Sequence, residues 1–172
     1  ANLSVLITQV KPAWLSDWIT QLRFGRGPGT LVVGTEDDEE GRSLSLAALK
    51  EGMRHLRSGG ILGVFVDRNL EQTGVVIPFF GEKTRVASGV AKMAMRTRSP
   101  IVTGLCRRLP GDRYGVEFGE PIIPTGAANN EDDLHALLTE IFNRLEHHIR
   151  RDPNQWVLLQ PVWPSESESS KV

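Results

Sequence analysis

The sequence is poor in the features that mark several protein classes. Cys106 is its only cysteine, so no internal disulfide bond can form, and we expect a buried, inert thiol inside a cell. No window approaches the roughly 18 consecutive apolar residues of a spanning helix, and no signal peptide is visible. Twenty Lys and Arg residues nearly balance 21 Asp and Glu residues, so the net charge of −1 does not indicate nucleic-acid binding.

The length and composition suit one folded domain. The 172 residues are 40% hydrophobic, which is enough for one substantial core. No internal repeat is visible, and only the Ser/Glu-rich tail from Ser165 has the composition of a disordered segment. We therefore predict a domain over residues 1–164 and a disordered tail over residues 165–172. The chain begins at Ala1, without methionine and directly in an alternating run, which suggests a fragment or a processed product.

Hydrophobic periodicity predicts strands that alternate with helices. This order favours an α/β fold, a mostly parallel mixed sheet with an antiparallel edge and flanking helices. The strands are expected at residues 3–8, 30–33, 61–66, 101–106 and 114–118. The helices are expected at residues 12–22, 43–57, 88–94 and 130–151, with Ser43 and Ser88 as N-caps. The first helix carries apolar residues at helical spacing, namely Trp14, Leu15, Trp18, Ile19 and Leu22.

Residues 59–91 carry the strongest functional signal. The apolar run 61–66 follows a Gly-Gly break and predicts a strand covered on both faces. Asp67 and Arg68 come at its carboxyl end, where open α/β sheets bind ligands. The pair is either a structural ion pair or turn, or a site in which Arg68 binds a phosphate or orients a carboxylate.

A glycine-punctuated loop is expected after this pair. Gly74, Gly81 and Gly89 would let the backbone adopt a positive φ or approach a ligand. Phe79 and Phe80 are either core residues or the wall of a ligand site.

Two charged segments have more than one interpretation. Lys83 and Arg85 precede the helix expected at Ser88, so they form an anion site with its free N–H groups or a solvated basic turn. Five acidic residues at 36–40 are a solvated run or, alternatively, metal ligands, and the solvated run is the simpler interpretation.

The histidines do not indicate a catalytic dyad. His135 with Glu140, and His147 with Asp152, both have four residues between them. Positions i and i+5 of a helix lie about 140° apart, so these side chains diverge. We expect a surface role for His55. A nucleophilic serine has no support, because no Gly-x-Ser-x-Gly motif occurs.

The helix expected at residues 130–151 is amphipathic. It ends in His147, His148, Arg150 and Arg151, and Trp156 and Trp163 follow. This pattern would suit docking at an anionic membrane surface. Packing on the sheet is the simpler use of its apolar face.

These motifs resemble those of the bacterial lysophospholipid acyltransferase-like enzymes, which include the lipid A lauroyl/myristoyl acyltransferases. The matching segments are residues 59–68, residues 74–81 ending in Pro-Phe-Phe-Gly, and Thr84, Arg85, Ser88, Gly89 and Ala91. Residues 11–15 and 153–163 look more like the phosphatidylinositol mannoside acyltransferase branch than the lipid A branch. The resemblance covers about residues 3–163.

The resemblance implies a glycerolipid acyltransferase-like fold and transfer of a fatty acyl group from acyl-CoA or acyl carrier protein to a hydroxyl of a membrane glycolipid or phospholipid. It places the enzyme peripherally on the cytoplasmic face of the bacterial inner membrane, with no cofactor besides the acyl donor and no nucleic-acid partner. The substrate-side residues that it implies are Asp67, Arg68, Gly74, Phe79, Phe80, Gly81 and Arg85.

The family's general base is a histidine in a His-x-x-x-x-Asp/Glu block that precedes the segment beginning at Leu3. That block and the family's N-terminal membrane-docking helix are absent here, and we expect this chain alone to be inactive. The alternative is a noncatalytic, acyltransferase-derived subunit that binds lipid or a protein partner. A nucleotide-binding α/β protein is a weaker hypothesis, because no Gly-x-Gly-x-x-Gly motif or P-loop follows a strand.

Overall fold

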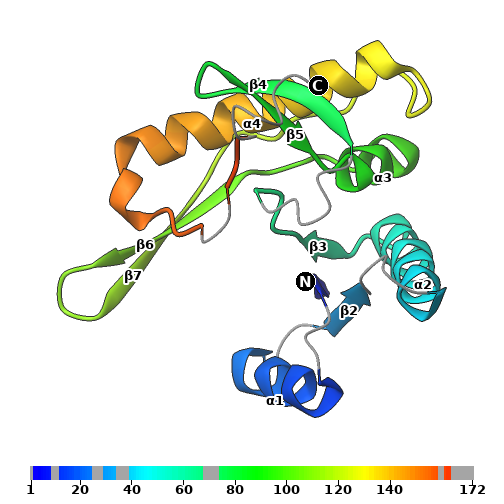
Figure 1. Cartoon of the computed structure of the whole chain (residues 1–172), viewed down its shortest axis with the longest axis horizontal. Coiled ribbons are helices and arrows are strands. Elements are labelled where there is room, and N and C mark those ends of the chain that lie inside the picture. The colour runs from blue at the N-terminus through cyan, green and yellow to red at the C-terminus, as the bar shows by residue number, and fades with distance from the viewer. Residues whose placement is uncertain are drawn as a thin grey trace. The chain divides into compact units, whose positions relative to one another are not determined.

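The computed structural model describes residues 2–8, 12–24, 29–33, 39–67, 74–158 and 161–163. They form an α/β fold with a parallel sheet, four helices and two β hairpins (Figure 1). The fold class predicted from the sequence is confirmed. The chain divides into two compact units, Ala1–Phe65 and Val66–Val172.

The first unit contains the parallel sheet. Its elements are β1 (Leu3–Thr8), α1 (Ala13–Phe24), β2 (Gly29–Val33), α2 (Glu39–Arg57) and β3 (Ile61–Gly63). The strand order is β2-β1-β3, and Val5 of β1 lies opposite Thr30 and Gly63. The chain moves from β1 to one neighbour and then across to the other, so right-handed crossovers put α1 and α2 on opposite faces. Figure 1 shows these helices separated by the strands.

The second unit consists of two hairpins and two helices. Its elements are β4 (Val75–Phe79), β5 (Glu82–Val86), α3 (Gly89–Thr97), β6 (Gly104–Leu109), β7 (Arg113–Phe118), α4 (Glu131–Arg151) and the 3-10 turn η1 (Pro153–Gln155). Asn130 caps α4, because its side chain accepts the N–H groups of Asp132 and Asp133. The apolar face of α4, which includes Leu138 and Ile141, packs on β4. These side chains form the core together with β4 residues such as Ile77.

Several predicted boundaries were wrong. β3 ends at Gly63, and Phe65 is 71% exposed, so the run 61–66 is not a strand covered on both faces. Residues 74–81 are not a loop, because most of them belong to the β4–β5 hairpin. α2 begins at Glu39, which puts Ser43 inside the helix and not at its N-cap.

The segment 101–118 also differs from its prediction. Ile101 makes only an isolated bridge with Ile122, and the strand begins at Gly104. β6 and β7 pair antiparallel as a two-stranded sheet of their own. Cys106 is exposed, not buried, because its neighbour across the hairpin is Val116 on the solvent side, itself 60% exposed.

Candidate substrate-side site

The β4–β5 hairpin closes through a two-residue turn, Phe80-Gly81. Their φ angles are 56° and 90°, and positive φ at both central positions is the pattern of a type I′ turn, which matches the twist of paired strands. Gly74 at the open end has a φ of 115°, and a Cβ there would clash with the Val86 carbonyl oxygen. The predicted need for positive φ is confirmed at Gly74 and Gly81. Gly89 has no positive φ, and a Cβ there would meet nothing within 4 Å.

Phe80 is held in this unusual backbone conformation from α4. Its N–H donates to Glu146 Oε2 at 2.7 Å, and the Arg150 guanidinium carbon lies 4.9 Å from the centre of its ring. Arg150 also binds Glu146 at 2.7 Å. The Phe80 N–H and then the Arg150 guanidinium hold the pKa of Glu146 below its usual range, although partial burial opposes them.

Five aromatic rings gather around the hairpin tip, and we call them the hairpin cluster. They are Phe79, Phe80, Phe142, Trp156 and Trp163. Phe79 is 1% exposed and contacts all four others edge-on or stacked, so it is a core residue. Phe80 is half-buried and stacks on Trp156, with ring centroids 6.0 Å apart.

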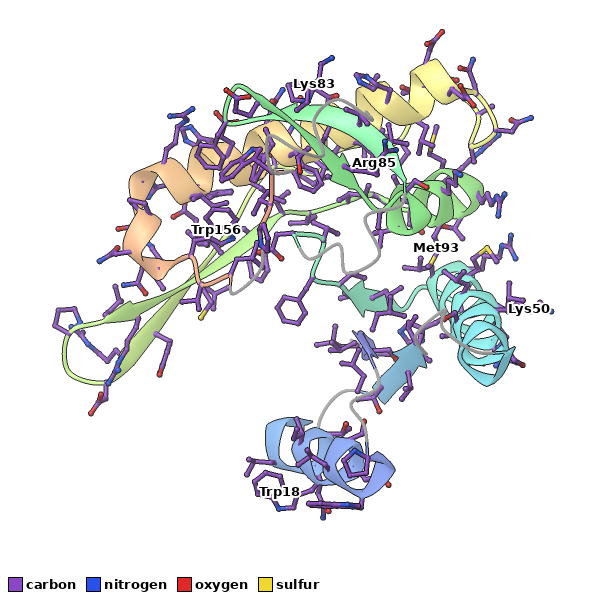
Figure 2. The ribbon with its side chains drawn as sticks, viewed as in Figure 1. Trp18, Lys50, Lys83, Arg85, Met93 and Trp156 are labelled. Carbon is purple, nitrogen blue, oxygen red and sulfur yellow. The ribbon has the colours of Figure 1, made fainter. Side chains whose placement is uncertain are left out.

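Asp67 joins this cluster through a tryptophan. Its Oδ2 accepts the Trp156 Nε1–H at 2.9 Å, and Figure 2 labels Trp156 near the end of α4. Asp67 therefore has an indole partner, whereas Arg68 lies outside the described residues. Sequence reasoning missed this bond, because 89 positions separate the two residues and no spacing pattern connects them.

The segment 161–163 adds further contacts to the hairpin. Trp163 Nε1–H donates to the Phe79 carbonyl at 3.0 Å, and the Thr84 hydroxyl donates to the Val162 carbonyl. Both tryptophans that follow α4 therefore pack on the hairpin, with their N–H groups satisfied.

Comparison with known proteins shows the family. The family model for bacterial lipid A biosynthesis acyltransferases matches residues 5–165. The chain belongs to this family. A phosphatidylinositol mannoside acyltransferase of Mycobacterium tuberculosis is 28% identical over 116 residues, which cover 67% of this chain and 35% of that protein. The protein of the same name from Mycolicibacterium smegmatis is 31% identical over 100 residues, which cover 58% of this chain and 31% of that protein.

These matches confirm the family and branch predicted from the motifs. The chain spans about a third of the length of the curated relatives that it matches. The residues matched by the family model include both Phe79-Phe80-Gly81 and Trp156. The structure brings the rings of Phe79 and Phe80 into contact with the ring of Trp156.

The basic residues of β5 lie on its outer face. Lys83 is exposed, while Arg85 is half-buried and donates to the Gly74 carbonyl at 3.1 Å (Figure 2). Thr84 between them points to the other face and is buried. Ser88 stands before α3, but its side chain makes no capping hydrogen bond, so that part of its prediction was wrong. The anion site at Lys83 and Arg85 stays a prediction.

The histidine–carboxylate pairs of α4 do not form dyads. Glu140 binds Arg144 at 2.7 Å, and Asp152 binds Arg107 at the same distance, so each carboxylate has a basic partner other than its histidine. His55, expected at the surface, is half-buried. Its Nε2 lies 3.0 Å from the Asn2 carbonyl and 3.1 Å from the Ile61 carbonyl, so it bridges the starts of β1 and β3.

The apolar face of α4 is not free for a membrane. Most of its large apolar side chains are buried in the core, Leu145 packs against that core half-buried, and His148 is only 7% exposed. Arg150 and Arg151 bind Glu146 and Glu117. Packing on the sheet, the simpler of the two interpretations, is correct for α4, whose apolar face packs on β4 of the two-stranded β4–β5 sheet.

Neither a metal centre nor a spanning helix is found in the part of the chain that the structure describes. No three His, Cys, Asp or Glu side chains gather there as metal ligands would. Residues 36–38, most of the acidic run, lie outside the described residues. None of the described helices has the length and apolar character needed to cross a bilayer.

Proposed function

We propose that the chain is part of an enzyme that transfers a fatty acyl group from acyl-CoA or acyl carrier protein to a hydroxyl of a membrane glycolipid or phospholipid. The family match over residues 5–165 carries this proposal, and the two relatives named phosphatidylinositol mannoside acyltransferases support a glycolipid acceptor. We propose residues 1–164 as part of one family domain, and a peripheral location on the cytoplasmic face of the bacterial inner membrane.

The reaction is an exchange of a thioester for an oxygen ester. The acceptor hydroxyl oxygen attacks the thioester carbonyl, the C–O bond forms, the C–S bond breaks, and the carrier thiol leaves. A hydroxyl with a pKa far above 7 needs a nearby base to take its proton. We assign that step to the His-x-x-x-x-Asp/Glu block that the family resemblance implies.

The hairpin cluster and the Asp67-Arg68 pair form the substrate side in this proposal. Arg68 binds the substrate phosphate or the catalytic carboxylate, for which a guanidinium fork is suited. Trp156 orients Asp67, and the Phe80 ring and the backbone at Gly81 line the acyl site. The hydrogen bond of 2.9 Å between Asp67 and Trp156 supports this arrangement. Gly74, Phe79 and Arg85 support this site from within the β4–β5 hairpin.

A noncatalytic subunit that binds lipid or a protein partner is the second candidate. It is favoured by one observation: each carboxylate spaced to pair with a histidine of α4 binds an arginine instead. The two candidates differ in whether the complete gene product transfers an acyl group.

The test compares two arginine variants of the complete gene product that contains these residues. Radiolabelled acyl donor and membrane lipids are supplied to wild type, Arg68→Ala and Arg108→Ala. Arg108 is an exposed residue of the β6–β7 hairpin and pairs with Asp112. Its replacement therefore controls for the removal of a positive charge. We expect transfer to fall at least about a hundredfold in Arg68→Ala alone, with unchanged thermal unfolding, since charge-assisted contacts are worth a few kcal/mol. Wild-type activity in Arg68→Ala would overturn the assignment of Arg68.

A further inference from the structure

One face of α1 carries large apolar side chains that remain exposed. Trp14, Trp18 and Leu22 are spaced by four residues, so they form one stripe along the helix. They are 68%, 57% and 69% exposed. The opposite side of the helix carries Ser16, which is 7% exposed. Figure 2 shows Trp18 on the side of α1 that faces away from the strands.

The two tryptophans of α1 differ from the other two in their partners. Trp156 and Trp163 stack on Phe80 or Phe79 and donate their N–H groups. Within the described part of the chain, no ring contact or hydrogen bond is found for Trp14 or Trp18. A ring that needs an apolar surface and an N–H group that needs a polar acceptor suit the headgroup level of a bilayer.

The amino-acid sequence through α1 has a net positive charge, which suits an anionic surface. Residues 11–26 contain Lys11, Arg23 and Arg26, and Asp17 is their only acidic residue. Helices that lie on anionic bilayers combine Trp and Leu on one face with nearby Lys and Arg. The 12 residues of α1 are too few to span a bilayer, so the helix would lie in the plane of the interface.

We propose that the stripe of Trp14, Trp18 and Leu22 is the surface through which this protein docks on an anionic lipid bilayer. The inference rests on the proposed function, in which the acceptor is a membrane lipid. It transfers the membrane-facing role from α4, whose apolar face is buried, to α1.

The test is vesicle binding by the full 172-residue chain, measured by co-sedimentation. The vesicles are phosphatidylcholine with or without phosphatidylglycerol. The variant Trp14→Ser/Trp18→Ser is compared with Tyr114→Ser/Phe118→Ser, a matched pair of aromatic residues that are 67% and 71% exposed on β7. We expect wild type and the β7 variant to bind alike, and the α1 variant to bind at least about tenfold more weakly. Wild-type binding should also weaken without phosphatidylglycerol and at high salt.

Three results of the vesicle assay would overturn the proposal. They are unchanged binding by the α1 variant, an equal loss in the β7 variant, and absence of wild-type binding to anionic vesicles. Sedimentation velocity adds a fourth, a wild-type dimer that the α1 variant dissociates, because the stripe would then be a protein interface. Circular dichroism checks that both variants fold, and Leu22→Ser provides a milder variant with both tryptophans intact, expected to weaken binding less.

Failure of this proposal is distinguishable from failure of the proposed function. Vesicle binding is measured without an acyl donor. A complete gene product that binds vesicles through α1 but transfers no acyl group would contradict the proposed function alone. A complete gene product that transfers the acyl group, and whose α1 variant still binds vesicles normally, would contradict the docking surface alone.

Discussion

Phe80 occupies a backbone position that glycine or asparagine usually takes. A positive φ costs a side-chain-bearing residue on the order of 1–2 kcal/mol. The contacts that offset this cost are the Glu146 hydrogen bond, the Trp156 ring and the Arg150 cation. The residue is therefore strained locally but fixed by α4 and the segment that follows it, which is why a Phe-Gly pair can close this turn.

Phe80→Gly should destabilise the protein even though glycine relieves the strain. Loss of a half-buried aromatic ring costs more than the relieved φ returns, so we expect the free energy of unfolding to fall by about 1–2 kcal/mol. Asp112→Gly is the control, since Asp112 has a φ of 54° at an exposed turn. Urea denaturation should show little change in the free energy of unfolding of Asp112→Gly. A Phe80→Gly protein as stable as wild type would mean that the ring contacts contribute nothing.

Glu146 should make stability depend on pH. Its pKa is lowered in the folded state, so its stabilising effect is present above the ordinary pKa of about 4.3 and is lost as the pH falls through the lower, folded value. We expect Glu146→Gln to be less stable than wild type near neutral pH, with the difference shrinking in acid. Chemical denaturation across this range measures it, with exposed Glu82→Gln as the control. A difference that grows as the pH falls would contradict the sign.

At the scale of elements, the β4–β5 hairpin was the main feature that sequence analysis missed. Pro78 argues against a strand, and Phe-Gly is not among the dipeptides that usually announce a hairpin. Pro78 is tolerated because β4 pairs with β5 alone among the described strands. In contrast, α4 was predicted almost to the residue, because its acidic start, basic end and apolar periodicity are all local signals.

Gly74→Ala should disrupt this hairpin at its open end. The new Cβ would clash with the Val86 carbonyl, and the φ of 115° is unfavourable for alanine, so we expect a loss of roughly 2 kcal/mol or more in unfolding free energy. Gly89→Ala, in the first turn of α3 with free space around it, should be neutral or stabilising by up to about 1 kcal/mol. Thermal unfolding of both variants compares them, and equal melting temperatures would refute the role of Gly74.

At the scale of the whole molecule, local patterns predicted the fold class and the family but not the contacts of the site. The run 59–91 crosses the boundary between the two units at Phe65 and Val66. Asp67 is held by Trp156, and Phe80 by Glu146, from positions 89 and 66 residues away. Such pairs depend on tertiary packing, so periodicity and spacing contain no information about them. The motif resemblance included both partners of the first pair without showing that they meet.

Acyl transfer by the complete wild-type gene product tests the central claim most directly. The protein is incubated with radiolabelled acyl-CoA or acyl carrier protein and a membrane lipid extract, and the lipids are separated before and after mild alkali. We predict label in a glycolipid or phospholipid as an alkali-labile ester. Folded protein that binds the lipids but transfers no label from either donor would contradict the acyltransferase assignment and favour the noncatalytic subunit.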